Sequence, residues 1–478
     1  MSEEQGITVS KEENISAWYQ ELIVKSNLAD YSSVSGCIVY RPLAYSIWER
    51  VKEEVDKRFK EIGIENAYFP LLIPESLLEK EAEHFQGFTP EVAWVTEAGN
   101  SELNERLAIR PTSEAIMYDS YSKWIKSWRD LPLKLNQWNN VIRWEFKHPT
   151  PFLRTREFLW NEGHNVYETK EGALEDKVRV LGAYKEVVED YMALPGFIGR
   201  KTEKEKFAGA VDTWSMEHLL PDGKAIQGPD YHYDGTNFAE AFEITFMGRG
   251  SEEKYPHQTT YAITTRQLGI MIMVHSDDRG LVIPPKLAPI KTVIVPIPAD
   301  EDYNERILEK GREISSKLED CKIDDRENQT PGWKFNEWEL KGVPLRIEIG
   351  PEEIKENTLT LVRRDNQEKI TVEQSEAKEK VEEILEKIQK KLLKNAREFL
   401  NENTRETRSY GELKQILEEK GGFIKAPWCG KSSCEKKIKD ETTAKITNIP
   451  SKYETPENEE CIKCGEKAKY WVNFAKSY

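Results

Sequence analysis

The segment that most constrains the fold spans residues 141–160, VIRWEFKHPTPFLRTREFLW. Its two ends alternate between polar and apolar side chains, a pattern typical of β-strands, whose side chains point to opposite faces in turn. Arg143 and Glu145 fall on one face of the first strand, and a proline-rich loop with Arg154 follows. The second strand carries on one face Phe158, Trp160, Glu162 and His164. We therefore predict two strands within residues 135–168, joined by a basic loop.

This segment gathers positive charge in an acidic chain, since the 478 residues have a formal net charge of -16. Planar, permanently charged guanidinium groups suit phosphate oxygens, and the flat ring of Phe158 offers a surface on which a purine stacks. No GxxxxGK(S/T) phosphate loop occurs in the chain. The two strands and their loop are thus predicted to hold a nucleoside triphosphate. Taken alone, the first strand fits a half-buried strand with a salt bridge better.

Composition narrows the class of protein. With 38% hydrophobic and 32% charged residues, the chain is expected to be globular but polar, in about two to four domains. No run of about 18 apolar residues occurs, so no transmembrane helix and no membrane partner are expected. The start, MSEEQGITVSKEEN, lacks the basic flank and apolar core of a signal peptide, which favours the cytoplasm.

A proline-rich stretch, GLVIPPKLAPIK, predicts a linker at residues 280–291, because a double proline breaks both helices and strand ladders. Before it, an apolar stripe predicts a helix over residues 43–62, with its buried face at Ile47, Val51, Val55 and Phe59. After it, short strands alternate with helices at 302–318 and 374–398, which indicates a small α/β domain. A third segment begins near residue 400.

Four of the six cysteines lie in this third segment as two close pairs, CGKSSC and CIKC. Four thiolates can close a tetrahedral zinc site, and the predicted ligands are Cys429, Cys434, Cys461 and Cys464. Two redox pairs are the alternative. They are less favoured because no thioredoxin-like βαβ pattern surrounds the cysteines.

Together these motifs resemble class II aminoacyl-tRNA synthetases. Arg143-Trp144-Glu145, the basic loop and Phe158 resemble motif 2; GIENAYFP, ending at Pro70, resembles motif 1; TTRQLGIMIMVH resembles motif 3. Within the class, RPTSE, REFLWNEGH, PDGKAIQ, NFAEAFEI, GLVIPPKLAP and KFNEWELKGVPLRIEIGP resemble prolyl-tRNA synthetases of the archaeal and eukaryotic type. The resemblance covers nearly the whole chain, in order.

The resemblance implies an α+β fold in three domains. They are a class II antiparallel-sheet catalytic domain, an α/β anticodon-binding domain and a small zinc-binding α+β domain, at residues 1–285, 286–398 and 399–478. It also implies the reaction. L-Proline and ATP, with Mg²⁺, give prolyl-adenylate and pyrophosphate, and the prolyl group then passes to the terminal ribose of tRNA(Pro). Motif 1 implies a homodimer, and the cysteines imply a structural Zn²⁺.

The same resemblance assigns roles to single residues. Arg143, spanning the proline carboxylate and the α-phosphate, and Arg266, facing adenine, are expected to be catalytic. Proline is expected to contact Thr112, Glu114, Arg143, Trp160 and His232. ATP is expected to contact Arg143, Glu145, Arg154, Thr155, Phe158, Gln227, Thr264 and Arg266. Glu339 and Arg346 are expected to read guanines of the anticodon, although a surface salt bridge explains each residue alone nearly as well.

The sequence departs from the family pattern at two places. Asp230-Tyr231-His232 stands where the family usually reads Thr-Ser-His, and Tyr261-Ala262 stands where it usually reads Trp-Gly. The two places are expected to lie on neighbouring strands, and Asp230 is not assigned as a ligand. By the same resemblance, Tyr478 and its carboxylate are expected to fold back toward the catalytic domain.

Two other functions stay open at this point. The same scaffold can activate a different amino acid, or the chain can be a tRNA-binding or regulatory protein that has lost adenylation. The retained arginines argue against the second alternative, whereas Asp230 and Ala262 keep the first one open. The span between motifs 2 and 3 is short, so no editing insertion is expected.

Overall fold

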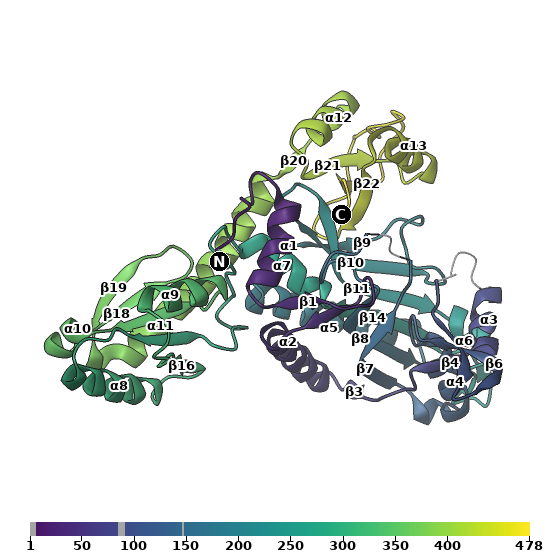
Figure 1. The fold of residues 1–478 in the computed structure, drawn as a ribbon. Helices are drawn as coiled ribbons and strands as arrows, with labels where there is room; N and C mark the ends of the chain where they lie inside the picture. The colour runs from purple at the N-terminus through teal and green to yellow at the C-terminus, as the bar shows by residue number, and fades with distance from the viewer. Residues whose placement is uncertain (1–5, 85–90, 146–147) are drawn as a thin grey trace.

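The computed structural model describes residues 6–84, 91–145 and 148–478. Three bodies are visible in Figure 1, a large sheet-and-helix body, an α/β body on the left and a smaller body at the top. The largest sheet has 11 strands in the order β20-β21-β23-β22-β9-β10-β11-β14-β8-β7-β3. The predicted α+β class with three parts is confirmed.

The middle of this sheet is antiparallel. Its strands are β7 (Leu133–Ile142), β8 (Glu157–Tyr167), β14 (His257–Thr264), β11 (Ala225–Gly235), β10 (Asp212–Leu219) and β9 (Phe197–Arg200). The two strands predicted around the basic loop are β7 and β8, paired from Ile142↔Glu157 to Leu133↔Val166. Strands β10 and β11 form a second antiparallel pair, from Asp212↔Tyr233 to Leu219↔Ala225.

The expectation that VIRWEF continues as one strand is wrong beyond Ile142, where β7 ends. The Arg143 amide still bonds the Arg156 carbonyl, at 2.8 Å, but the Trp144 amide turns away to the Glu91 carbonyl, at 2.9 Å. The chain leaves the ladder because its next backbone donor pairs with a different segment. Arg143 thus stands at the start of the loop.

Helices cover one face of the sheet, and they are α1 (Ile15–Lys25), α2 (Pro42–Glu61), α5 (Lys170–Glu186) and α7 (Arg266–His275). The stripe of α2 predicted from the sequence is buried, with each of its four side chains no more than 2% exposed. Tyr261 of β14 packs edge-on against Phe59 of α2 and Tyr184 of α5. Because side chains alternate along a strand, the neighbours of Tyr261 point to the opposite, open face.

Small elements border the central sheet. They are β1 (Ala29–Tyr31), β2 (Ile38–Tyr40), β3 (Glu65–Asn66), β4 (Leu72–Pro74), α3 (Glu75–His84), β5 (Trp94–Ala98), β6 (Ser101–Ile109), α4 (Glu114–Trp124), η1 (Trp128–Asp130), η2 (Val187–Tyr191), α6 (Asn237–Ala241), β12 (Phe246–Met247) and β13 (Glu253–Lys254). Residues 64–74, IENAYFPLLIP, form only the short strands β3 and β4, each at the edge of its sheet. The edge positions agree with the two prolines of this segment, because proline cannot donate a ladder hydrogen bond.

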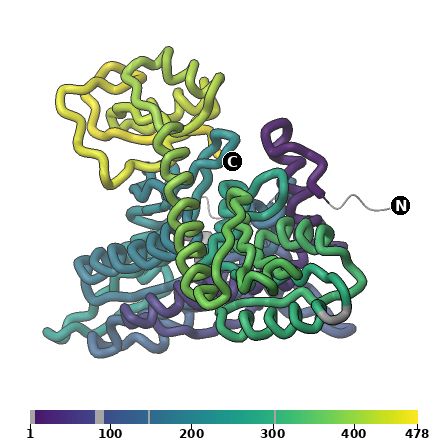
Figure 2. Tube along the Cα trace, turned by 90° about the vertical axis from the view of Figure 1, so that its left-hand side faces the viewer, coloured from purple at the N-terminus to yellow at the C-terminus, as the bar shows by residue number. Residues whose placement is uncertain are grey.

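The α/β body holds a five-stranded sheet in the order β16-β15-β17-β18-β19. Its elements are β15 (Thr292–Pro296), α8 (Glu301–Ser315), β16 (Cys321–Ile323), α9 (Pro331–Leu340), β17 (Leu345–Ile349), α10 (Pro351–Glu356), β18 (Thr358–Arg363), β19 (Lys369–Glu373), η3 (Gln374–Glu376) and α11 (Ala377–Glu402). In Figure 2, α11 runs as a rod from this body to the C-terminal one. No helix in the described ranges is long and apolar enough to cross a membrane.

The C-terminal body contains β20 (Thr404–Glu406), α12 (Tyr410–Glu419), β21 (Phe423–Trp428), α13 (Ser432–Thr442), β22 (Lys445–Pro450) and β23 (Tyr470–Ala475). Its strand β22 pairs with β9 at Ile449↔Arg200. The C-terminal strands therefore extend the central sheet, a continuity that the sequence did not indicate.

Candidate functional site

The open face of the central sheet is hollowed into a cavity of about 280 Å³. Its walls come from the loop between β7 and β8, from strands β8, β11 and β14, and from the starts of α4 and α7. The segment between β9 and β10, residues 201–211, closes one side with Phe207. Side chains that are far apart in the sequence thus face one space.

Almost every residue predicted to contact proline or ATP lines this cavity. They are Thr112, Glu114, Arg143, Arg154, Thr155, Phe158, Trp160, Gln227, His232, Thr264 and Arg266. Glu145 is the exception, because it is exposed in the turn after β7 and is not part of the lining. Glu162 and His164, predicted to share the strand face of Phe158 and Trp160, line the cavity and are also buried.

The lining residues that sequence reasoning missed include Glu205, Phe207, Thr213 and Thr260. Two of them had a usable signal. Thr213 lies opposite His232 in the β10–β11 register, and Thr260 has the same parity on β14 as Ala262. Glu205 and Phe207 lie in an irregular loop, where no periodicity predicts which side chain points inward.

One end of the cavity is acidic. Glu114 opens α4 and is 4% exposed, and the Thr112 hydroxyl bonds its carboxylate. A second buried carboxylate, Glu162, accepts hydrogen bonds from the Ser113 amide at 3.0 Å and from Asn139 Nδ2 at 2.5 Å. Burial raises the pKa of Glu162, but hydrogen bonding and the charge of His164 outweigh it and leave this pKa below its ordinary value. Glu162 is therefore held as an anion by the wall around it.

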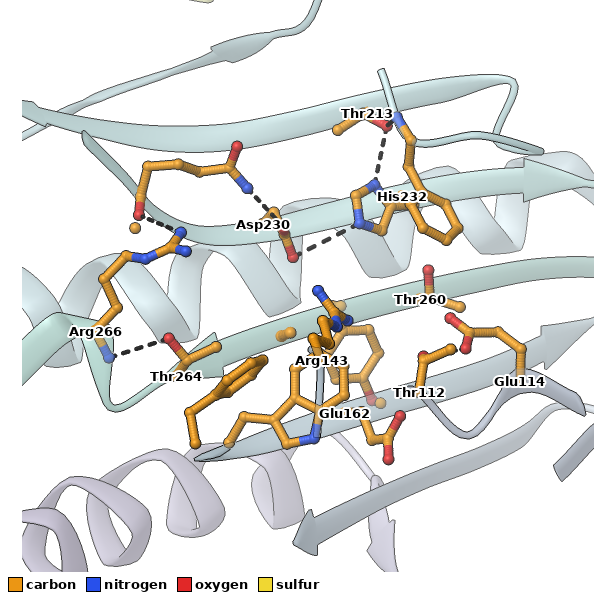
Figure 3. Close-up of a pocket in the computed structure, with 18 of the residues that line it drawn as sticks. Thr112, Glu114, Arg143, Glu162, Thr213, Asp230, His232, Thr260, Thr264 and Arg266 are labelled. Carbon is orange, nitrogen blue, oxygen red and sulfur yellow. Dashed lines mark hydrogen bonds and ion pairs between the residues drawn. The ribbon is translucent and has the colours of Figure 1, made fainter. Parts of the chain in front are cut away.

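His232 stands between the two ends of the cavity (Figure 3). Its Nδ1 lies 2.9 Å from the Thr213 hydroxyl, and its Nε2 lies 3.7 Å from Asp230 Oδ1. The Phe207 ring stacks on the imidazole with centroids 4.7 Å apart. Burial lowers the pKa of His232, so the ring is neutral at neutral pH. A neutral ring with an aromatic partner forms an apolar wall for a small substrate.

The other end of the cavity is cationic, and three guanidinium groups converge there. Arg143 is anchored by the Pro111 carbonyl at 3.0 Å, and its guanidinium carbon lies 5.5 Å from the Phe158 ring centroid. Arg266 donates to the Leu153 carbonyl at 3.1 Å. Burial, followed by the charge of Arg154, lowers the pKa of Arg266. Like charges held together at one end of a cavity favour a bound anion.

The two departures from the family pattern lie side by side on β11 and β14, as expected. Asp230 pairs with Ala262, and Tyr231 pairs with Tyr261. The two tyrosine rings stack with centroids 6.0 Å apart on the helix-covered face. On the cavity face, Asp230 Oδ2 accepts from Gln227 Nε2 at 2.8 Å. The changes thus put a ring pair in the core and a carboxylate in the cavity.

The end of the chain reaches the cationic end of the cavity. The Tyr478 amide donates to the Ala225 carbonyl at 2.9 Å, and Arg154 Nη2 donates to the Tyr478 carboxylate at 3.0 Å. Lys224 Nζ lies over the Tyr478 ring, 5.7 Å from its centroid. The expectation that Tyr478 folds back toward the catalytic domain is confirmed.

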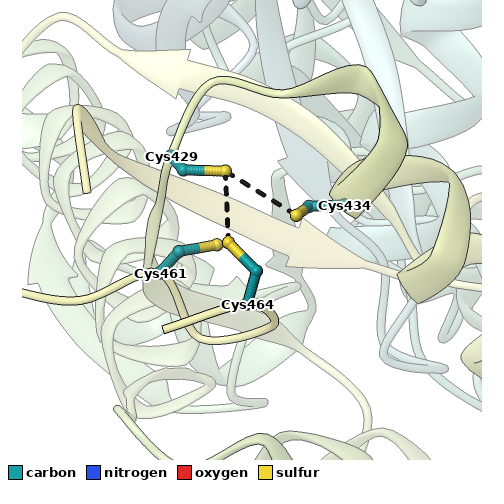
Figure 4. A group of neighbouring side chains, drawn as sticks. All are labelled: Cys429, Cys434, Cys461 and Cys464. Carbon is teal, nitrogen blue, oxygen red and sulfur yellow. Dashed lines mark hydrogen bonds between the residues drawn. The ribbon is translucent and has the colours of Figure 1, made fainter. Parts of the chain in front are cut away.

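The four C-terminal cysteines come together (Figure 4), and their sulfur atoms all lie within 4.8 Å of one another. Cys429 Sγ is 3.7 Å from Cys434 Sγ and 3.8 Å from Cys464 Sγ. With Zn–S distances of about 2.3 Å, a tetrahedral site separates its sulfurs by about 3.8 Å. The cluster fits a zinc ion.

Glu339, on α9, and Arg346, on β17, also meet. Arg346 Nη1 lies 2.8 Å from Glu339 Oε1, and Arg346 makes a second ion pair with Glu348, also at 2.8 Å. Nearby, Arg364 donates to Asp277 in a two-pronged contact and to the Glu339 carbonyl. The predicted anticodon pair therefore shares a salt bridge beside the junction with the catalytic body.

Comparison with known proteins covers all three bodies. Family models match residues 94–275 (tRNA synthetase class II core domain, G, H, P, S and T), 291–384 (Anticodon binding domain) and 410–478 (Prolyl-tRNA synthetase, C-terminal). The chain is 53% identical to the proline–tRNA ligase of Natranaerobius thermophilus, over 95% of this chain and 94% of that protein. It is 49% identical to that of Alkaliphilus oremlandii, over 98% and 97%.

A solved structure is similar throughout. It is the prolyl-tRNA synthetase of Cryptosporidium parvum in complex with halofuginone and AMPPNP, with a TM-score of 0.95 and 42% identity. The match covers 100% of this chain and 98% of that chain. The resemblance read from the motifs is confirmed over the full length.

Proposed function

Since the chain belongs to the prolyl-tRNA synthetase family of class II, we propose that it attaches L-proline to tRNA(Pro) in two steps that consume ATP. One observation carries the proposal. A single cavity joins a buried carboxylate at Glu114 to a cluster of three guanidinium groups. This arrangement suits a small amino acid and a triphosphate bound side by side. The carboxylate of Glu114 suits the ammonium of the amino acid, and the guanidinium groups suit its carboxylate and the phosphates.

In the first step the ammonium of proline binds Glu114 and Thr112, and its carboxylate binds Arg143. A carboxylate oxygen of proline then attacks the α-phosphorus of ATP, which enters as its magnesium complex, and pyrophosphate leaves. Arg143 offsets the charge that develops at the α-phosphate, and Arg154 binds the distal phosphates. Adenine lies between Phe158 and Arg266, and its contacts are completed by Thr155, Gln227 and Thr264. Trp160 and His232 enclose the pyrrolidine ring.

In the second step a hydroxyl of the terminal ribose attacks the carbonyl carbon of the adenylate, and AMP leaves. Glu339 and Arg346 lie in the anticodon-binding region and have donors and acceptors that suit guanine. They bond each other at 2.8 Å, so recognition of guanine exchanges this pair for contacts to the base. Glu145 stays a predicted ATP ligand that this conformation does not bring to the cavity.

The remaining features of the family are part of the same proposal. The domains are 1–285, 286–398 and 399–478, and a structural zinc held by the four cysteines stabilises the last one. Tyr68, in the motif 1 segment, is 71% exposed, which supports its burial in a homodimer. The residues between β8 and α7 belong to the central body, so the protein works without a cis-editing insertion. The enzyme acts in the cytoplasm.

Pyrophosphate exchange into ATP, screened over the twenty amino acids, tests the activity. Exchange is expected with proline, at a far higher kcat/KM than with any other amino acid. Exchange with a different amino acid, or no exchange with any, contradicts the proposal. Charging of a tRNA(Pro) transcript by the same preparation tests the second step separately.

A further inference from the structure

The segment 201–211, between β9 and β10, belongs to the amino-acid pocket on one side. Its Phe207 ring stacks on His232, and the Phe207 amide donates to the Thr213 hydroxyl at 3.0 Å. The same hydroxyl lies 2.9 Å from His232 Nδ1. The position of this loop therefore fixes one wall of the space that surrounds the amino acid.

On its other side, the same segment is tied to the C-terminal body. The Thr202 hydroxyl donates to the buried Glu435 carboxylate of α13 at 2.8 Å. Glu205, which lines the cavity, pairs with Lys445 at 3.0 Å and with Lys439 at 3.5 Å. These contacts cross between regions more than 200 residues apart in the sequence, so they form only when both bodies are folded.

A buried ion pair secures the start of the segment. Lys201 Nζ lies 2.6 Å from Glu217 Oε1 and also donates to the Thr447 carbonyl of β22 at 2.9 Å. Next to it, β22 pairs with β9 at Ile449↔Arg200. The loop is thus held at its root by the sheet and along its length by α13 and β22, while its inner face forms the pocket.

From these contacts we propose that the C-terminal domain sets the affinity of the pocket for the amino acid, by holding the 201–211 segment through Thr202 and Glu205. Thr202, Glu205, Lys439 and Lys445 are positioning residues, and Phe207 is the group that they position. The inference rests on the proposed function, because the amino acid is taken to be proline. The C-terminal domain thereby has a role in substrate binding in addition to its own folding.

The test compares two double variants of the full chain. Lys439→Met with Lys445→Met removes the two lysines that form ion pairs with Glu205. Lys436→Met with Lys437→Met removes the same charge from exposed positions of α13 and serves as the matched control. In proline-dependent pyrophosphate exchange, the first variant is expected to raise the KM for proline about threefold to tenfold. The KM for ATP, the kcat and the melting temperature are expected to stay close to those of the control.

A single-atom change tests the other contact. Thr202→Val removes the hydroxyl that bonds Glu435 with little change of shape, and it is expected to raise the KM for proline. Thr202→Ser keeps the hydroxyl and is expected to restore the wild-type KM for proline. An unchanged KM for proline in both Thr202→Val and the lysine variant overturns the inference, as does a joint loss of kcat, ATP affinity and melting temperature. Failure of the wild type to exchange with proline overturns the proposed function itself.

Discussion

The two ends of the cavity satisfy their charges differently. At the acidic end, Glu162 is surrounded by donors from the protein, among them Ser113 and Asn139. At the cationic end, burial has the largest effect on the pKa of Arg266 and lowers it. The charges of the neighbouring Arg154 and Arg143 lower it further. The charge of Glu162 is thus satisfied within the protein, whereas the like charges at the cationic end favour an added anion.

The largest effect is expected at the cationic end. Arg143→Gln is expected to lower kcat/KM for exchange about a hundredfold to a thousandfold, since a preorganised donor to the developing charge is lost. The melting temperature without substrates is expected to stay unchanged or to rise, because the repulsion with Arg266 is relieved. Steady-state kinetics and calorimetry measure the two quantities. A lower melting temperature with unchanged kinetics would mean that Arg143 serves the fold instead.

The acidic end offers a matched pair, Glu114→Gln and Glu162→Gln. Glu114→Gln is expected to raise the KM for proline about tenfold to a hundredfold, because its ammonium loses a charged partner. Glu162→Gln is expected to lower the free energy of unfolding by about 2–4 kcal/mol, since donors now face an amide NH₂. Equal effects of both variants on KM and on stability would contradict the distinction between the two carboxylates.

Glu162 also predicts a pH dependence. Its folded pKa lies below the ordinary value of 4.5, so its contribution to stability is present above that value and is lost as the pH falls through the folded pKa. Between about pH 5 and pH 3, the wild type is therefore expected to lose more stability than Glu162→Gln does. Urea unfolding at several pH values measures the difference, and parallel pH profiles of the two proteins would contradict it.

Parts of the cavity and of the fold differ in how far the sequence could predict them. The arginines, Glu114 and the cysteines stand in short motifs whose residue types match their chemistry, so the places where they gather could be predicted. The parity of β8 placed Phe158 and Trp160 on one face, which is the cavity face, whereas His232 was assigned by resemblance alone. Phe207 and the extension of the sheet by β22 were not readable, because both depend on long-range pairing that leaves no local pattern. The turn at Trp144 was missed for the same reason, since its amide bonds Glu91.

A smaller effect is expected at the chain end, where the Tyr478 carboxylate accepts from Arg154. Deletion of residues 476–478 removes this contact and the backbone bonds to Ala225. Aminoacylation is expected to fall about threefold to tenfold because Arg154 loses a positioning partner, while the oligomeric state is unchanged. A Tyr478→Phe control keeps the carboxylate and is expected to match the wild type. Full activity after the deletion would show that the tail has no part in placing Arg154.

The smallest effect is expected at Asp230, whose carboxylate lies on the cavity face of β11. Asp230 bonds Gln227 at 2.8 Å, and its charge repels a triphosphate unless a cation offsets it. Magnesium accepts carboxylate and phosphate oxygens together, so exchange is expected to need more magnesium in the wild type than in Asp230→Thr or Asp230→Asn, by about twofold to threefold. Proline is expected to stay the preferred amino acid in both variants. Titration of magnesium at fixed ATP measures the shift, and the Asn variant separates charge from shape because it keeps an acceptor for Gln227. If only the Thr variant responds, the shape of the pocket next to Ala262, and not repulsion by the carboxylate, sets the magnesium requirement.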